Sequence, residues 1–459
     1  MKETISSDFM TSEIDSPQRK KQVTNKLFKF VLSSMAAMWV FTIYTMVDGM
    51  FVAKGVGPDA LAAVNISMPM INVSFGLSIL FAIGASTKAS IYKGRNQYEK
   101  ADEIFTLSTI TVFLLSIVVA TVCLLNLEKL AVFLGATSAT KTYVMDYLRI
   151  ILLFDVCYMT AYNLEVLVKA DGFPEKAIYV PTLGAVVNIG LDYVFIFIFH
   201  WGIKGAAWAT GLSQLVTLIV FAHHFISDKS GFSFVKIRWS LMQTLSMAKL
   251  GISDFLTEFS MGVVIFIYNR TVLSVVGNSG VVIYTVISYI SQLVLMTMVG
   301  LNQGMQPLTS YYYGKKDGKT RRYLFRASMI VAVVLSVVAF LLNFVHPHPI
   351  VGLFINKGEN SQLFYHGVKA LRIFSFSFLP IGIVVVIAGY MTSLEKARSA
   401  MTISLCRGLI FVIISLTIMT KLFGETGIWM SMAISETCSM VLALILYNVN
   451  IKKIERKTI

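Results

Sequence analysis

Residues 27–52 read LFKFVLSSMAAMWVFTIYTMVDGMFV, and this stretch decides the fold. At about 1.5 Å rise per residue, a helix of this length crosses roughly 30 Å of hydrocarbon. Its one acid is Asp48. A carboxylate inside a bilayer is energetically costly, so it usually faces a water-filled cavity or a partner. We therefore predict a membrane helix with a functional acid, and a chain built around Asp48 and a second acid, Asp192.

The composition extends this prediction to the whole chain. Of its 459 residues, 56% are hydrophobic and 14% are charged, whereas soluble domains are about 25% charged. The apolar stretches are long and recur along the chain, which predicts an all-α polytopic membrane protein and not a β-barrel of short alternating segments. The net charge of +14 comes from basic residues between the stretches. That is the positive-inside pattern of a protein in a lipid bilayer, and we expect no nucleic-acid partner.

Twelve apolar stretches predict twelve transmembrane helices. They lie near residues 27–53, 60–87, 104–125, 143–168, 178–199, 205–226, 247–275, 280–309, 323–345, 364–391, 399–421 and 427–448. The predicted domains are a tail over 1–26, a first lobe over 27–226, a linker over 227–245, a second lobe over 246–448 and a tail over 449–459. Both tails and the linker are basic, so we place them, with both termini, on the cytoplasmic side. The polar start, through Ser16, predicts no cleavable signal peptide.

An internal repeat divides the twelve spans into two halves. Gly57 recurs as Gly277, 220 residues on, and Gly202 recurs as Gly424, 222 residues on. Each half holds six spans, so the two halves share one orientation in the membrane. Transporters with such parallel repeats bind their substrate between the halves, which rock to alternate access.

The repeat does not extend to the charges. Asp48 corresponds to Tyr268, and Asp192 corresponds to Ile414. Burying a carboxylate in a membrane costs free energy, and at these positions only the first half of the chain carries that cost. The difference indicates that the first half has a function that needs the acids. Helix rise places both acids in the outer half of the membrane. Asn188 lies one helical turn before Asp192, on the same face.

These residues predict a cation-coupling site. A carboxylate with an amide neighbour binds Na⁺ through its oxygens or takes up H⁺, and the sequence leaves that choice open. The alternative interpretation of Asp48, Asp192 and Asn188 is a structural hydrogen-bonded group. We expect no other metal. The four cysteines lie far apart within apolar spans and form no CxxC motif, which argues against a zinc site or disulfides.

Two acids of the fourth span each admit two interpretations. Asp155 lies near the middle of the span, where it belongs either to a functional polar network or to a local polar contact. Glu165 lies one turn before Lys169, so an i,i+4 ion pair is the alternative to a functional role. In the seventh span, Glu258 is interpreted as an acid at an entrance or interface.

The sequence motifs of common enzymes do not fit this chain. Gly314 to Thr320 resembles a P-loop, but it has three residues between its glycines where four are needed. No HExxH motif and no nucleophile elbow occurs. We expect no enzyme and no cofactor, and keep a membrane-embedded enzyme as a distant alternative.

Several short stretches together resemble one family. They are VDGMFVAKGVG at 47–57, ALAAV at 60–64, NIGLD at 188–192, GIKGAAW at 202–208, GLNQG at 300–304 and QPL at 306–308. In order and spacing they resemble the multidrug and toxic compound extrusion (MATE) transporters over residues 27–448. Within that family the chain looks closest to the bacterial branch of DinF-like and MepA-like exporters.

The resemblance implies a V-shaped pair of six-helix lobes, and drug export driven by H⁺ or Na⁺. It implies that Asp48, Asn188 and Asp192 form the cation site. By position it adds Tyr44, Tyr147 and Thr210 to a polar network, and Glu165 stands where the MepA-like branch also carries Glu. Asp155 matches no family residue.

The expected protein is thus a secondary antiporter, a monomer in a bacterial cytoplasmic membrane, that exports lipophilic cations by alternating access. A flippase for lipid-linked saccharides is the main alternative. It would need a cationic cavity for pyrophosphate, and the inward candidates we identify, Arg149 and Arg270, lie at interfaces.

Overall fold

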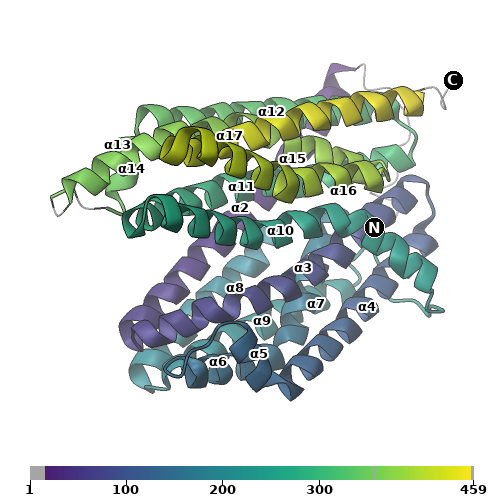
Figure 1. Ribbon diagram of the computed structural model, residues 1–459. Coiled ribbons are helices and arrows are strands. Elements are labelled where there is room, and N and C mark those ends of the chain that lie inside the picture. Colours follow the sequence, from purple (N-terminus) through teal and green to yellow (C-terminus); the bar gives the residue numbers. More distant parts are fainter. Residues whose placement is uncertain (1–15, 356, 359, 456–459) are drawn as a thin grey trace. The chain divides into compact units, whose positions relative to one another are not determined.

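The computed structural model describes residues 16–355, 357–358 and 360–455, and every regular element over these residues is a helix (Figure 1). The predicted tails lie partly outside the described residues, at 1–15 and 456–459. The chain forms two compact units. The first runs to Gly251 and includes Ser310–Thr320, and the second holds Ile252–Thr309 and the chain from Arg321 on.

The helices that lie wholly in the first unit are α2 Pro17–Gly55, α3 Pro58–Gly94, α4 Tyr98–Leu125, α5 Leu127–Phe133, α6 Lys141–Leu153, α7 Asp155–Ala170, α8 Lys176–Asp192, the π-helix η1 Tyr193–Ile198 and α9 Gly202–Ile226. The remaining helices are α10 Leu241–Val275, α11 Asn278–Gly314, α12 Gly318–Val345, α13 Pro347–Gly352, α14 Ser361–Phe374, η2 Ser375–Ser377, α15 Phe378–Ser393, α16 Ala397–Leu405, the π-helix η3 Cys406–Ile410 and α17 Phe411–Glu455.

The predicted twelve spans account for these helices. Among the described residues, nine helices are long and apolar enough to cross a membrane, or eleven spans if two bent helix pairs each count as one. One of the nine, over Ala397–Lys452, has 56 residues, roughly 84 Å at 1.5 Å per residue and too long for one crossing. Gly424 interrupts it with a non-helical backbone (φ 57°, ψ −131°). It is therefore two spans, and the all-helical polytopic fold is confirmed.

Several helix boundaries differ from the predicted ones. The first helix begins at Pro17, because Ser16 Oγ accepts a hydrogen bond from the Arg19 N–H (3.3 Å) and proline suits the first helical position. Residues 17–26 are therefore helical rather than a loose tail. Helix α10 begins at Leu241, inside the predicted linker. The fourth and tenth spans are bent, by 51° between α6 and α7 and by 42° between α14 and α15.

The backbone conformation of the loops explains why the internal repeat keeps its glycines. Loops related by the repeat place a residue in the left-handed region, which glycine adopts most easily. Three such pairs occur, namely Gly57 (φ 124°) with Gly277 (84°), Asn96 (58°) with Lys316 (62°), and Gly202 (58°) with Gly424 (57°). The repeated glycines therefore preserve the same turns between spans in each half.

The outward faces of the helices suit a lipid environment. On α4 the exposed side chains include Phe113, Leu114, Ile117, Val118 and Val122. A contiguous apolar face of this kind is rare on a soluble monomer. This helix therefore presents the surface expected of a membrane span.

The first unit brings together the helices that carry the predicted acids. Helix α2 packs along α8, α8 packs on α9, and α3 packs against α4 and α7 (Figure 1). At one end of this unit, α3 and the last residues of α11 cross at two glycines. A Cβ at Gly94 would overlap the carbonyl oxygen of Tyr311, and one at Gly314 would overlap that of Ile91. This close backbone approach requires glycine at both positions.

Candidate functional site

The structure brings Asp48 and Asp192 together in the first unit. Asp48 lies on α2 and is 7% exposed, and Asp192 is the last residue of α8 and is fully buried. Their carboxyl groups lie within hydrogen-bonding reach of each other. Two adjacent buried carboxylates repel when both are charged, so a proton or a metal cation between them lowers the energy.

The local backbone changes at the site. Helix α8 ends at Asp192, and the chain continues as the π-helix η1. A π-turn widens the helix by one residue and is frequent at functional sites. The change therefore begins at the buried acid itself.

Buried oxygens without partners mark this region. Both carboxylate oxygens of Asp192, one of Asp48 and the amide oxygen of Asn188 have no hydrogen-bond donor among the described residues. Buried polar atoms in proteins are nearly always paired, because an unpaired one retains its desolvation cost. Oxygen ligands of this kind suit Na⁺, and the carboxylates also accept H⁺.

The amide and hydroxyl predicted beside the acids form a pair of their own. Asn188 is fully buried on α8, and its Nδ2 donates to Thr210 Oγ1 on α9 at 3.4 Å. The amide nitrogen is therefore directed at Thr210, which leaves the oxygen of Asn188 as the atom without a partner.

Two tyrosines complete the surroundings of the acids. The phenol of Tyr44 interacts electrostatically with Asp48, Asp192 and Glu165, and that of Tyr147 interacts with Asp48 and Asp192. Tyr147 is buried and also belongs to the apolar cluster at this end of the unit. The residues predicted from separate spans thus converge on one region.

Glu165 has a partner that the sequence suggested. It lies on α7 and pairs with Lys169 at 3.6 Å, one turn later, and the lysine side chain is 1% exposed. The same acid interacts electrostatically with Tyr44. The i,i+4 ion pair and an electrostatic interaction with the network are therefore both present.

Asp155 lies at the bend of the fourth span instead. It opens α7, directly after the break from α6, and accepts a hydrogen bond from Ser74 Oγ on α3 at 3.1 Å. A carboxylate at a helix N-terminus is favoured by the helix dipole. This geometry matches the local polar contact that was the alternative interpretation of Asp155.

The second unit contains a buried ion pair that the sequence analysis missed. Arg407 Nε lies 2.9 and 3.0 Å from the two carboxylate oxygens of Glu436, and the two side chains are 10% and 1% exposed. Arg407 lies in the π-helix η3. The inward candidates identified from the sequence, Arg149 and Arg270, therefore left out Arg407. Arginine and glutamate inside apolar spans were the available signal.

The positions that match the first-unit acids are not acidic sites. Tyr268, the counterpart of Asp48, is buried and exchanges a hydrogen bond with Ser431 Oγ at 2.7 Å. Ile414, the counterpart of Asp192, is half exposed on α17. These two positions therefore repeat the asymmetry seen in the sequence.

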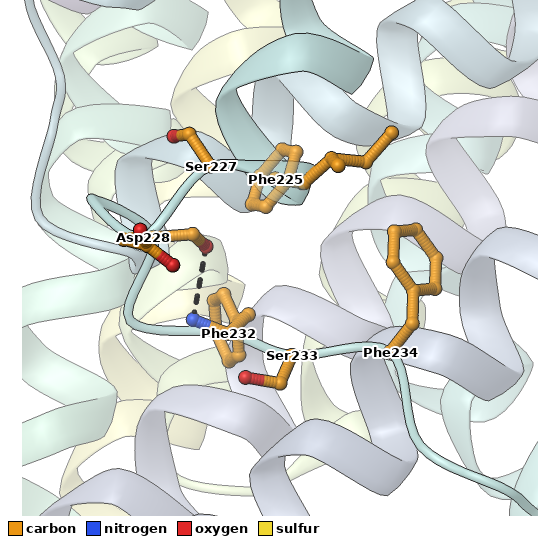
Figure 2. A pocket seen from close by; sticks show the side chains of 8 residues that line it. Phe225, Ser227, Asp228, Phe232, Ser233 and Phe234 are labelled. Atoms are coloured by element: carbon orange, nitrogen blue, oxygen red, sulfur yellow. Dashed lines mark hydrogen bonds between the residues drawn. The ribbon is translucent and has the colours of Figure 1, made fainter.

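A cavity of about 400 Å³ lies beside the segment that follows α9 (Figure 2). It is lined by Phe225, Ile226, Ser227, Asp228, Ser230, Phe232, Ser233 and Phe234. Its one acid is exposed, and Lys93 Nζ lies 3.4 Å above the ring of Phe232. It contains none of the predicted site residues, and the nearby lysine makes it a poor cage for a cation.

Comparison with known proteins identifies the family. The family model described as MatE matches residues 34–194 and again residues 255–417. The two matches fall on the two halves of the internal repeat. Together they cover most of the chain.

Individual relatives agree with this assignment. The chain is 26% identical over 431 residues to "Multidrug export protein MepA" of Staphylococcus saprophyticus, covering 93% of this chain and 94% of that protein. A MATE transporter solved in complex with MaL6 superposes with a TM-score of 0.89 at 19% identity, over 95% of this chain and 97% of that one.

A MOP superfamily transporter from Pyrococcus furiosus, whose binding pocket has a reverse polarity that suggests a different function, superposes with a TM-score of 0.87 at 20% identity, over 94% and 97% of the two chains. The structures share the fold, and the family model carries the assignment. The chain belongs to the MatE family and is a multi-pass membrane transporter rather than an enzyme.

Proposed function

We propose that this transporter is a multidrug exporter that moves lipophilic cations out of the cell in exchange for H⁺ or Na⁺. The observation that supports this most is the adjacent pair of buried acids, Asp48 and Asp192, whose oxygens lack donors. The relative named as a multidrug export protein adds support through 26% identity over nearly the whole chain. The membrane is the bacterial cytoplasmic membrane, with both termini in the cytoplasm and the protein a monomer.

Uptake of the cation is the first step of the proposed cycle. A cation from outside binds between Asp48 and Asp192, and the oxygen of Asn188 provides a further ligand if the ion is Na⁺. Binding cancels the repulsion of the two carboxylates and their desolvation cost. Helices α2 and α8, which carry the acids, then repack.

Repacking of the first lobe is coupled to alternating access. The lobe with the bound cation favours the state that is open to the cytoplasm, where a lipophilic cation binds. The coupling ion leaves to the cytoplasm as the drug binds, and return to the outward state then exports the drug. One elementary charge moving through 100 mV supplies about 2.3 kcal/mol, to which the ion gradient adds.

The flippase alternative is less well supported. It would need unpaired positive charge for a pyrophosphate group. Arg407, a buried arginine within the apolar spans, is neutralised by Glu436. The inward acids of the first unit suit cations instead.

The test is ethidium efflux from energised membrane vesicles, with Na⁺ and pH gradients imposed separately. We expect Asp192→Asn and Asp48→Asn to abolish gradient-driven efflux. Tyr268→Phe is the matched control, because Tyr268 is the counterpart of Asp48 in the second half, and it should retain efflux. The gradient that drives wild-type efflux names the coupling ion. Unchanged efflux in both Asn variants would refute the proposed site.

A further inference from the structure

A second group of buried charges lies in the first unit, where α7 ends. Asp171 directly follows α7, and its side chain is fully buried. Its Oδ1 accepts a hydrogen bond from Lys93 Nζ at 2.9 Å, and its Oδ2 accepts one from His224 Nε2 at 3.0 Å. The proposed transport site uses none of these residues.

The hydrogen-bond direction through His224 is fixed by its other neighbour. Lys176 Nζ lies 2.7 Å from His224 Nδ1. An ammonium group has only donors, so Nδ1 accepts and the ring hydrogen is on Nε2, where it donates to Asp171. Burial alone would raise the pKa of Asp171, but Lys93 and His224 outweigh burial and hold that pKa below its ordinary value.

The remaining donors to Asp171 come from the segment after α9. The Gly231 N–H lies 3.0 and 3.1 Å from the two carboxylate oxygens, and Ser230 Oγ donates to Oδ2 at 3.3 Å. A Cβ at Gly231 would lie 2.7 Å from Asp171 Oδ1 and 3.3 Å from Lys93 Nζ. Glycine therefore lets this backbone reach the carboxylate.

The next residue adds an aromatic contact. Phe232 is 1% exposed and stacks on Phe105 of α4, with ring centroids 5.2 Å apart and planes 6° from parallel. Lys93 Nζ, already bound to Asp171, lies 3.4 Å from the centre of the Phe232 ring. The Phe232 N–H is bonded to Ser230 Oγ at 3.0 Å, the dashed line in Figure 2. One lysine thus holds both the acid and the segment that binds it.

Helix α4 holds the following residues. The Ser233 N–H donates to Asp102 Oδ1 at 3.0 Å, and the Val235 N–H donates to Thr106 Oγ1 at 3.2 Å. Residues 230–235 are therefore bonded to the first unit over their whole length. Residues 236–240 follow without regular structure, and α10 then begins.

We propose that Asp171 is a positioning residue for transport, which anchors residues 230–235 to the first lobe and thereby holds the start of α10, the helix that continues from the first unit into the second. With the anchor closed, five residues, 236–240, lead from the anchor to α10, a reach of roughly 17 Å at 3.3–3.6 Å per residue. Without the anchor, the free segment before α10 starts at the end of α9. The role in transport depends on α10, which both units share. The role in transport rests on the proposed alternating-access export, whereas the anchor itself does not.

Two variants open the anchor by different means. Asp171→Asn removes the charge that binds Lys93 and His224. Gly231→Ala keeps every charge and instead places a methyl group against Asp171 Oδ1. Asp228→Asn is the matched control, because it removes one carboxylate from the same segment, at an exposed position outside the anchor.

The first measurement is hydrogen exchange of residues 227–240 in lipid nanodiscs. It needs no drug and no gradient, so failure of the proposed export leaves it unaffected. We expect Asp171→Asn and Gly231→Ala to speed exchange at residues 230–235 at least tenfold, and Asp228→Asn to leave it as in wild type. Unchanged exchange in both anchor variants would overturn the anchor.

The second measurement is transport in vesicles, with whichever cation the wild type exports. A loosened start of α10 slows lobe movement but leaves the drug site intact. We expect the two anchor variants to lower the maximal efflux rate severalfold while the KM for the drug stays constant. Faster exchange together with an unchanged maximal rate would overturn the positioning role.

Discussion

The buried pair Arg407–Glu436 makes a prediction about what holds the second unit together. Removing one partner leaves the other charge buried and unpaired, whereas replacing both with apolar groups removes the desolvation cost altogether. We therefore expect Glu436→Gln and Arg407→Met each to destabilise the protein strongly. The double variant Arg407→Met with Glu436→Leu should recover most of that loss.

The magnitude follows from the geometry. Both carboxylate oxygens lie 2.9–3.0 Å from Arg407 Nε, and exposures of 10% and 1% leave little room for screening by water. Breaking a buried pair of this kind costs about 3–5 kcal/mol. That is roughly two to four orders of magnitude in the ratio of folded to unfolded protein. Salt should change the result little, because screening acts mainly on exposed charges.

Intrinsic tryptophan fluorescence during thermal unfolding in detergent is a suitable assay. Trp429 is 2% exposed in the apolar cluster of the second unit. With the four tryptophans of the first unit, Trp39, Trp201, Trp208 and Trp239, replaced by phenylalanine in every variant, the emission reports on the second unit. We expect both single variants to unfold well below the wild type and the double variant to unfold near it. Single variants that unfold like wild type, or a double variant that loses as much as both singles combined, would refute the reasoning.

Three further predictions follow from other contacts. Gly94→Ala forces α3 away from the carbonyl of Tyr311 and should cost about 1–3 kcal/mol by overpacking, measured as a lower unfolding temperature. The pKa of Asp171 lies below its ordinary value, so its contribution to stability is complete above about pH 4 and is lost as pH falls further. Protection of residues 230–235 against hydrogen exchange, taken relative to the intrinsic exchange rate at each pH, should therefore fall on acidification in wild type, but not in Asp171→Asn. Tyr268→Phe removes the 2.7 Å hydrogen bond to Ser431, which keeps its bond to the Ile428 carbonyl. It should cost about 0.5–1.5 kcal/mol of stability, measured as a slightly lower unfolding temperature.

The fold could be predicted from the sequence because its causes are local. Apolar length fixes the spans, and the repeated glycines Gly57 and Gly277 fix the same turn in each half, since both adopt a positive φ. Helix ends were less predictable. The start at Pro17 depends on a single serine cap in a polar stretch, and the bend before Asp155 has no proline or glycine to announce it.

The site residues could be predicted only where a single apolar span contains an acid, because burying that acid costs free energy. Asp48 and Asp192 stand out as acids in apolar helices, and the structure brings them together. The pairing of Asp171 with Lys93 and His224 could not be anticipated, because it joins residues of three separate segments.

The two halves of this chain differ in how they treat buried charge, and that difference bears on which half performs coupling. In the second unit, Glu436 is held by Arg407, so it has no need of an incoming cation. In the first unit, Asp192 has no donor for either oxygen, although Lys169 and Lys93 are buried in the same unit. Those lysines are bound to other acids, Glu165 and Asp171. A lobe that pairs Glu165 and Asp171 with lysines but leaves Asp192 without one keeps Asp192 available for a mobile cation, which is what an ion-coupled transporter requires.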